Sequence, residues 1–407
     1  WGENAAGQLG VRDMEDRYKP VIVNGSQSML DANITDIVVG AEHSMALDSD
    51  GRVFTWGRCD EGQLGYGQFE TRIPPELGGE GQEKPTEEEP ASAISKVRRI
   101  NTGTEHQAPA ALMLIGGDII TGFGAGYEHS LLITSSGKLL AFGSNRNGQL
   151  GIGRQTRSDP KFQGGSETFV VVTPTRIKGP ISKTRVAMVS LGAAHTAAIT
   201  ERGELYTWGE SFHGRLGFHA VGSVYKPRLV PDFTYIESLR VSCGAFHTLV
   251  LTADSRVFSF GIPDARLGIG DSIKEGTNET PTRMAGLDSA IDVCAGSDHS
   301  LALLANGQVV SWGNGGQYGR LGISQNPGPT GKPALAHNTD VSTPIPVFCE
   351  IEPPHQHQHE LMLAAPLVTH GGKDTRGISC QSNHSAVVSV DGQVYTWGCN
   401  ISGRLGH

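Results

Sequence analysis

The amino-acid sequence predicts an all-β fold, a seven-bladed β-propeller of four-stranded blades whose ring closes near the two termini. Three observations lead to this prediction. A glycine-rich motif occurs seven times, a histidine-containing motif precedes six of its copies at a constant distance, and the chain begins and ends in the same part of the repeat. Self-similarity with a period of about 20 to 50 residues is typical of solenoids and propellers.

The first motif begins with an aromatic residue and glycine and ends with leucine and glycine. Its seven copies span residues 1–10, 56–65, 142–151, 208–217, 260–268, 312–322 and 397–406. One copy is a residue short and another a residue long, a variation that loops tolerate. Seven units of roughly 52 residues, each with about four short strands, describe the blades of a propeller.

The second motif has the form Gly-x-x-His-Ser/Thr, with a departure in the last copy, and continues into apolar residues. Its six copies begin at residues 40, 126, 192, 244, 296 and 381, each 16 positions before the aromatic residue of the following first motif. Between the two motifs, alternating apolar and polar residues flank a turn pair such as Asp50-Gly51. This pattern predicts a β-hairpin. A lone hairpin is marginally stable in water, so the units must pack on one another.

The repeats predict a single propeller domain over residues 1–407 with three insertions. The insertions are expected at about 68–110, 154–172 and 324–374. All three enter at the same point of the repeat, which puts them at corresponding edges of their blades. An open β-solenoid is the alternative, but the matching ends at Trp1 and His407 favour a ring. Because the opening copy lacks its first strand, we expect the seam of the ring to be its weakest part and the natural protein to continue there.

The composition argues against several classes of protein. A formal net charge of −9 at pH 7 disfavours a broad nucleic-acid-binding surface. No apolar run approaches the ~18 residues of a membrane span, and no signal-peptide pattern is visible. The six cysteines form no CxxC pair and no zinc spacing, and Cys243, Cys294 and Cys380 lie in apolar, strand-like runs. We therefore expect a reducing, intracellular location, nuclear or cytoplasmic.

The combined pattern Gly-x-x-His-Ser/Thr, Trp-Gly and Gly-Gln/Arg-Leu-Gly resembles the regulator of chromosome condensation repeat over the whole chain apart from the insertions. The resemblance implies a seven-bladed propeller. The founding member of that family is a nuclear, chromatin-bound guanine nucleotide exchange factor for the small GTPase Ran. Relatives are interaction modules in HECT-type ubiquitin ligases, in ciliary GTPase regulators and in a plant ultraviolet-B photoreceptor. The photoreceptor's tryptophans beside the repeat histidine are absent here, so photoreception is not expected.

The predicted function is a non-enzymatic, monomeric scaffold that binds a protein partner through one face and the insertion loops, without a cofactor. The alternative is an exchange factor for a Ran-type small GTPase, associated with chromatin and without covalent catalysis. The resemblance implies a wedge with a G-[ST]-F-R-D-like stretch, and the nearest text, residues 164–179, lacks the F-R-D portion. The candidate partner-binding residues in this insertion are Arg154, Arg157, Asp159, Lys161 and Glu167.

The repeated residues are interpreted as structural, because equivalent positions in every unit are poor candidates for a catalytic set and buried imidazoles need hydrogen-bond partners. These residues are His43, His129, His195, His247, His299, His384, Trp56, Trp208, Trp312, Trp397, Gly65, Gly151 and Gly217.

A second group of histidines lies in the third insertion. His355, His357 and His359 alternate and would share one face of an extended segment, as ligands of zinc or nickel do. A low-complexity loop is the favoured interpretation, so no metal site is predicted.

Overall fold

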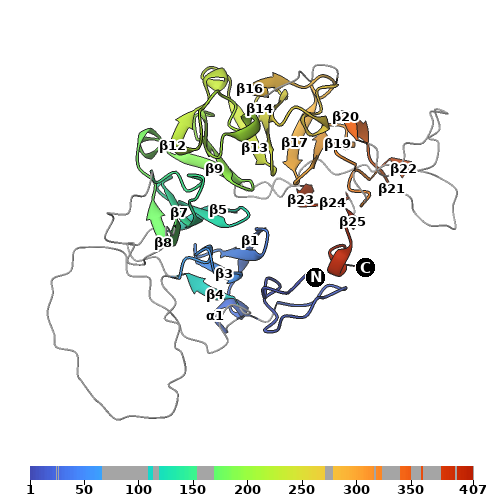
Figure 1. The fold of residues 1–407 in the computed structure, drawn as a ribbon. Coiled ribbons are helices and arrows are strands. Elements are labelled where there is room, and N and C mark those ends of the chain that lie inside the picture. Colours follow the sequence, from blue (N-terminus) through green and yellow to red (C-terminus); the bar gives the residue numbers. More distant parts are fainter. Residues whose placement is uncertain are drawn as a thin grey trace, which may run out of the picture.

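The computed structural model arranges β-sheets as blades around a central axis (Figure 1). The structure describes residues 1–23, 25, 27–66, 109–112, 119–153, 169–270, 278–315, 318–322, 340–349, 359–360, 377–389 and 392–406.

Within each blade, strands that are consecutive in the chain pair antiparallel. The first strands pack against one another near the axis: β1 (Ile34–Val39), β5 (Ile120–Ala125), β9 (Val186–Leu191), β13 (Ser238–Cys243), β17 (Ala290–Ala295) and β23 (Ile378–Gln381). The second strands each begin at a repeat histidine: β2 (His43–Asp48), β6 (His129–Thr134), β10 (His195–Thr200), β14 (His247–Thr252), β18 (His299–Leu304) and β24 (His384–Val388).

The outer half of each blade follows the hairpin turn. The third strands end in the aromatic-glycine pair, or one residue beyond it in the second blade: β3 (Val53–Gly57), β7 (Leu139–Ser144), β11 (Leu205–Gly209), β15 (Val257–Gly261), β19 (Val309–Gly313) and β25 (Val394–Gly398). Five blades add a fourth strand: β4 (Ala110–Leu112), β8 (Val170–Arg176), β12 (Val224–Leu229), β16 (Asn278–Arg283) and β20 (Val341–Pro346). β20 therefore lies inside the segment predicted as the third insertion.

The described residues form six blades, five with four strands and one with three, so the prediction of seven blades is wrong. The seven copies of the first motif exceed the number of blades because a blade needs a hairpin, and the copy at residues 1–10 belongs to no hairpin in the described structure. The N-terminal residues 1–23 make a single isolated bridge, between Gly2 and Arg17, in place of a sheet.

This N-terminal segment connects the sixth blade to the first. Trp1 Nε1 donates a hydrogen bond to the Arg404 carbonyl over 3.2 Å, and the Arg404 guanidinium pairs with Glu3. At its other side, the carbonyl of Gln8 accepts a hydrogen bond from Trp56 Nε1 over 2.9 Å. Both termini therefore lie at the same point of the ring (Figure 1).

Short elements complete the described structure. One α-helical turn, α1 (Gln27–Leu30), precedes the first blade, and 3-10 turns occupy three of the first motifs: η2 (Phe212–Gly214), η4 (Ala265–Leu267) and η6 (Ile401–Gly403). Two more 3-10 turns, η1 (Pro180–Lys183) and η3 (Pro231–Phe233), connect blades, and β21 (Phe348–Cys349) pairs with β22 (His359–Glu360). No helix in the described part of the chain has the length and apolarity to cross a membrane.

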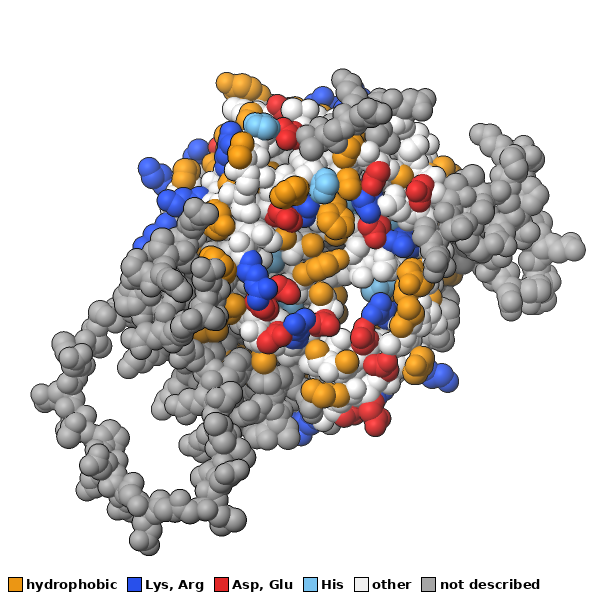
Figure 2. All heavy atoms as spheres, viewed as in Figure 1, with side chains coloured by type: hydrophobic (Ala, Val, Ile, Leu, Met, Phe, Trp, Pro, Cys, Tyr) orange, Lys and Arg blue, Asp and Glu red, His pale blue; other side chains and the backbone are white. Residues whose placement is uncertain are grey.

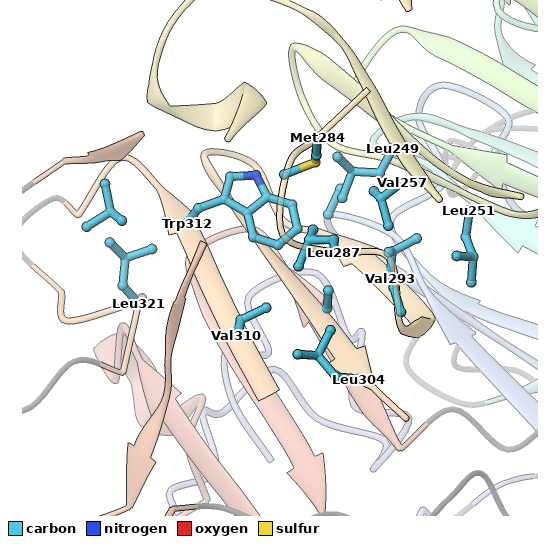
Figure 3. Packing of buried hydrophobic residues seen from close by; sticks show 14 residues of the cluster. Leu249, Leu251, Val257, Met284, Leu287, Val293, Leu304, Val310, Trp312 and Leu321 are labelled. Atoms are coloured by element: carbon cyan, nitrogen blue, oxygen red, sulfur yellow. The ribbon is translucent and has the colours of Figure 1, made fainter. Parts of the chain in front are cut away.

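The hydrophobic core lies between neighbouring blades. Because side chains of a strand alternate between its two faces, β18 contributes to two clusters. Ala302 and Leu304 pack with residues of the fourth blade, while Leu301 and Leu303 pack with residues of the sixth. Figure 3 shows the indole of Trp312 within the first of these clusters, directed towards Met284.

Replacing Trp312 with alanine should lower the free energy of unfolding by about 3–5 kcal/mol, because the side chain is fully buried and its removal leaves a cavity. Urea denaturation measures this loss. Trp1 occupies the same place in its motif but is 45% exposed, so Trp1→Ala should cost clearly less. Equal losses for the two variants would contradict the burial difference as the cause.

Candidate protein-binding face

Each hairpin brings its two motifs to the same edge of the blade. His43 pairs with Gly57 across β2 and β3, while the turn at Asp50-Gly51 lies at the opposite end. The other five hairpins have the equivalent histidine-glycine pairing. The loops before each histidine and after each aromatic-glycine pair therefore lie on one side of the ring, called the motif face below. The hairpin turns lie on the opposite face.

A repeated hydrogen bond joins neighbouring blades beneath the motif face. In five joints, the imidazole Nε2 lies near the hydroxyl oxygen of the Ser or Thr that follows the histidine of the next blade. The pairs are His43–Ser130 (2.9 Å), His129–Thr196 (3.0 Å), His195–Thr248 (2.9 Å), His247–Ser300 (2.8 Å) and His299–Ser385 (2.7 Å).

The hydroxyl groups determine which imidazole nitrogen carries the hydrogen. Thr196 Oγ1 donates to the main-chain carbonyl of Gln149 over 2.8 Å. Ser130 makes the equivalent bond to Gln63 over 2.9 Å. A hydroxyl has one hydrogen, so it must accept from the imidazole, and Nε2 is the protonated nitrogen in these joints.

The same carbonyl receives a second hydrogen bond from the aromatic residue of the next blade. Trp208 Nε1 donates to the Gln149 carbonyl over 2.9 Å. Trp312 and Trp397 donate in the same way to the carbonyls of Arg266 and Arg320. Gly151, two residues after Gln149, has a φ of 69°, and a Cβ there would lie 2.7 Å from Trp208 Nε1. Glycine is the residue that fits here, because it adopts a positive φ without strain and has no Cβ to collide with the indole. Gly65 and Gly217 are similarly pressed against Phe142 and Phe260.

Burial keeps these histidines neutral. It lowers the pKa of His43 to about 4 and the pKa values of His129, His247 and His299 to about 3. Burial also lowers the pKa of His195, which like the preceding four is completely enclosed. At neutral pH, each neutral imidazole therefore donates its Nε2 hydrogen to the hydroxyl of the next blade.

Paired charges surround the motif face. Arg58 bonds to Glu42 (2.6 Å) and Asp60 (2.7 Å), and Arg146 of the second blade reaches Glu61 of the first over 2.5 Å. Figure 2 shows acidic and basic side chains gathered next to each other on one face, with hydrophobic side chains between them. Arginine-carboxylate pairs of this kind hold both side chains in a defined direction.

Further arginines link the third, fourth and fifth blades. Asp298 receives both Arg266 (2.6 Å) and Arg320 (3.0 Å). Arg215, whose side chain is 2% exposed, bonds to Glu210 over 2.9 Å and donates to the carbonyl of Ala245 in the next blade. Burial lowers the pKa of Arg215 while Glu210 opposes the shift.

Phe246 is the aromatic centre of this part of the face. Its ring is flanked by the guanidinium groups of Arg215 (5.1 Å) and Arg266 (5.3 Å), and the residue is 37% exposed. The ring of His213 meets it edge-on at 6.3 Å. The aromatic–arginine patch comprises Phe212, His213, Arg215, Phe246, Arg266, Tyr318 and Arg320.

This patch is not among the sites predicted from the sequence. One signal was available: the position before the repeat histidine is Glu42, Glu128 or Asp298 in three blades but Phe246 in the fourth. The pairing of that ring with arginines from two different blades depends on the ring geometry and has no signature in the sequence.

Glycines from four blades line a small depression at the central axis. This depression is lined by Gly126, Gly192, Gly244 and Gly296 among other residues. Tyr127 of the second blade and Ser297 of the fifth face each other across it, with their hydroxyl oxygens 2.5 Å apart. This contact ties opposite sides of the ring together.

The second insertion leaves its blade at the motif face. Asn145 N–H, next to the end of β7, donates to the Phe169 carbonyl over 2.6 Å, and Val170 pairs with Ser144. The predicted partner-binding residues between these anchors lie outside the described residues: Arg154, Arg157, Asp159, Lys161 and Glu167.

The histidine-rich segment is described only at its end. His355 and His357 lie outside the described residues, whereas His359 belongs to β22 and pairs with Cys349 through the main chain. Among the residues that the structure describes, no group of three or more His, Cys, Asp or Glu side chains is arranged to hold a metal ion.

Comparison with known proteins matches nearly the whole chain to one family. The sequence model described as "RCC1-like domain" matches residues 125–407. The model described as "Regulator of chromosome condensation (RCC1) repeat" matches residues 1–47 and 50–133.

Individual proteins show the same similarity. The chain is 30% identical over 362 residues to human "Probable E3 ubiquitin-protein ligase HERC6", covering 87% of this chain and 30% of HERC6. It is 28% identical over 331 residues to "Ultraviolet-B receptor UVR8" of Arabidopsis thaliana, covering 80% of this chain and 62% of UVR8. The chain thus spans less than two thirds of either relative. The crystal structure of Prp20p from Saccharomyces cerevisiae has a similar fold, with a TM-score of 0.65, 19% identity, and coverage of 100% of this chain and 81% of Prp20p.

Acidification from pH 7 to pH 5 should destabilise the ring by roughly 2 kcal/mol for each fully buried histidine. The folded-state pKa values are lowered, so between about 6.5 and the folded values of about 3 to 4 the unfolded chain binds more protons. The contribution of these histidines to the free energy of unfolding is therefore fully present above a pH of about 6.5, the pKa in the unfolded chain, and it decreases as the pH falls below that value. Thermal unfolding midpoints measured across it check the sign, and an unchanged midpoint at pH 5 would contradict the buried neutral state.

Proposed function

The chain belongs to the regulator of chromosome condensation (RCC1) repeat family, and we propose that it is a scaffold that binds a protein partner through the motif face. The aromatic–arginine patch over the third to fifth blades is the observation that carries this proposal. Aromatic residues and arginine are the types enriched at the energetic centres of protein interfaces.

The patch is held ready for binding. Asp298 fixes Arg266 and Arg320, and the two guanidinium groups beside Phe246 restrict its ring. Side chains that are already ordered lose less conformational entropy when a partner binds. A rigid aromatic anchor surrounded by oriented arginines therefore favours a specific contact over a loose one.

The charge pattern favours a protein over a nucleic acid. Several of the arginines on this face, including Arg58, Arg215, Arg266 and Arg320, pair with carboxylates, and the chain carries a net charge of −9. A phosphate backbone needs a surplus of positive charge. A protein surface that offers an apolar pocket for Phe246 and mixed charges around it fits this face.

The insertions add to the proposed surface. The two described residues that flank the second insertion, Asn145 and Phe169, are hydrogen-bonded to each other on the motif face, where we propose that the partner binds. We assign Arg154, Arg157, Asp159, Lys161 and Glu167 to contacts that select the partner.

A second candidate function is nucleotide exchange on a Ran-type small GTPase, in association with chromatin. Its support is membership of the family, together with an insertion anchored on the motif face. Prp20p, whose fold is similar, has binding properties towards Gsp1p and histones, and these are properties of that protein.

Substitution of Phe246 by alanine should weaken partner binding at least tenfold, equivalent to about 1.4 kcal/mol or more, because it removes the anchor of the patch. Affinity capture with quantitative mass spectrometry, comparing wild type with F246A, identifies the partner, and titration of that partner measures the change in Kd. Tyr235 is a matched control, since it is aromatic and 98% exposed. It lies three residues before Ser238, whose N–H bonds to the Gly203 carbonyl in the hairpin turn of the third blade, on the opposite face.

Y235A should bind as the wild type does. Loss of every captured protein in both variants, or full retention in F246A, would argue against the motif face as the binding surface.

The exchange candidate is tested with Ran loaded with a fluorescent GDP. If the protein is an exchange factor, micromolar amounts accelerate GDP release, and replacing residues 154–168 with a short Gly-Ser linker abolishes the acceleration while β8 is spared. No acceleration by the intact chain would rule out exchange on Ran, and unchanged release by the linker variant would rule out this insertion as the wedge.

A further inference from the structure

Two thiols meet at the joint between the fifth and sixth blades. The Sγ atom of Cys380 in β23 lies 2.8 Å from the Sγ atom of Cys294 in β17. Cys294 is buried and Cys380 is partly exposed. Both residues belong to the first strands of their blades, although 85 residues separate them in the chain.

The repeat geometry brings these two positions of neighbouring first strands together. In the joint between the third and fourth blades, Ser190 Oγ accepts a hydrogen bond from the main-chain N–H of Cys243 over 3.0 Å. In the next joint, Ser242 Oγ accepts from the N–H of Ala295 over 2.9 Å. The penultimate residue of one first strand thus reaches across to a residue at the end of the next first strand.

Cys294 and Cys380 occupy these two positions in the following joint. Cys294 is the penultimate residue of β17, the position that Ser242 has in β13. Cys380 pairs with Ser385, the residue after the repeat histidine, and Cys243 has the same pairing with Thr248. A thiol therefore stands in place of the crossing serine, and a second thiol stands at the residue that the serine contacts. Among the joints described by these contacts, this is the one with cysteine at both positions.

We propose that Cys294 and Cys380 are a redox site that forms a reversible disulfide between the fifth and sixth blades. The oxidant is a low-molecular-weight disulfide such as oxidised glutathione. The thiolate of the more exposed Cys380 attacks one glutathione sulfur, breaks its S–S bond and releases one glutathione thiolate. Cys294 then loses its proton and attacks the Cys380 sulfur, releasing the second glutathione. Two electrons and two protons pass from the cysteines to two glutathione molecules.

The bond would act on the sixth blade. This blade has three strands in the described structure, and it adjoins the N-terminal segment that links the ends of the ring. A covalent link from β23 to β17 holds its first strand against the fifth blade and restricts the unfolded chain over the whole separation of the two cysteines. Oxidation therefore makes this side of the ring more resistant to unfolding.

The first test is to incubate the reduced chain with oxidised glutathione and measure its intact mass. The expected product lacks the mass of two hydrogen atoms and returns to the reduced mass with dithiothreitol. Tandem mass spectrometry of the linked tryptic peptides must assign the bond to Cys380, because Cys399 lies in the same predicted tryptic peptide. A lasting glutathione adduct on Cys380, a bond to another cysteine, or no reaction would overturn the proposal.

The second test compares thermal unfolding midpoints of the oxidised and reduced forms. Wild type should show a higher midpoint when oxidised, and C294S and C380S should each lose this difference. C243S is the matched control, because Cys243 occupies the position of Cys380 two blades earlier and its pKa is raised to about 12 by burial. C243S should keep the full difference, and its loss there as well would show that the effect does not come from the proposed pair.

Discussion

The hydrogen bond from a buried imidazole to the next blade is the interaction on which the ring depends. A blade is a small sheet that cannot bury its apolar residues alone, so its stability comes from its neighbours. The bond between His195 and Thr248, and its equivalents, places adjacent blades in one relative position, because Thr248 also donates to the carbonyl of Arg215. Hydrophobic packing then fills the space that these polar contacts define.

The same contacts shape the motif face. The carbonyl of Arg215 accepts a hydrogen bond from Thr248, and the carbonyls of Arg266 and Arg320 accept from Trp312 and Trp397 of the next blade. These bonds hold the loops on the motif face from which the three arginine side chains project. Their guanidinium groups then reach Asp298 or flank Phe246. The inter-blade hydrogen bonds beneath the surface thus hold the charged and aromatic side chains above them in place. In this way the same repeated residues support a surface that differs from blade to blade.

The N-terminal segment joins the first and sixth blades without forming a sheet in the described structure. Its copy of the first motif makes the inter-blade contacts of the loop and tryptophan seen in the other copies. The Trp1 indole donates to the carbonyl of Arg404, and the Trp397 indole makes the same bond to Arg320. The carbonyl of Gln8 accepts from the Trp56 indole, and the carbonyl of Gln149 accepts from Trp208 in the same way. These contacts connect the neighbouring blades although the segment forms no sheet, so the inter-blade contacts of a motif are separable from the strands of a blade.

The sequence by itself determined the hairpins, their turns, the shared edge of the two motifs and the family, because these follow from short-range alternation and from a spacing of 16 residues repeated six times. It misled on the number of blades, because the motif marks the end of a hairpin and the copy at residues 1–10 forms no hairpin in the described structure. Only the tertiary structure decided which residues of different blades meet. Phe246 between Arg215 and Arg266, and Cys294 against Cys380, are contacts between blades whose geometry comes from closing the ring, and no local pattern encodes them.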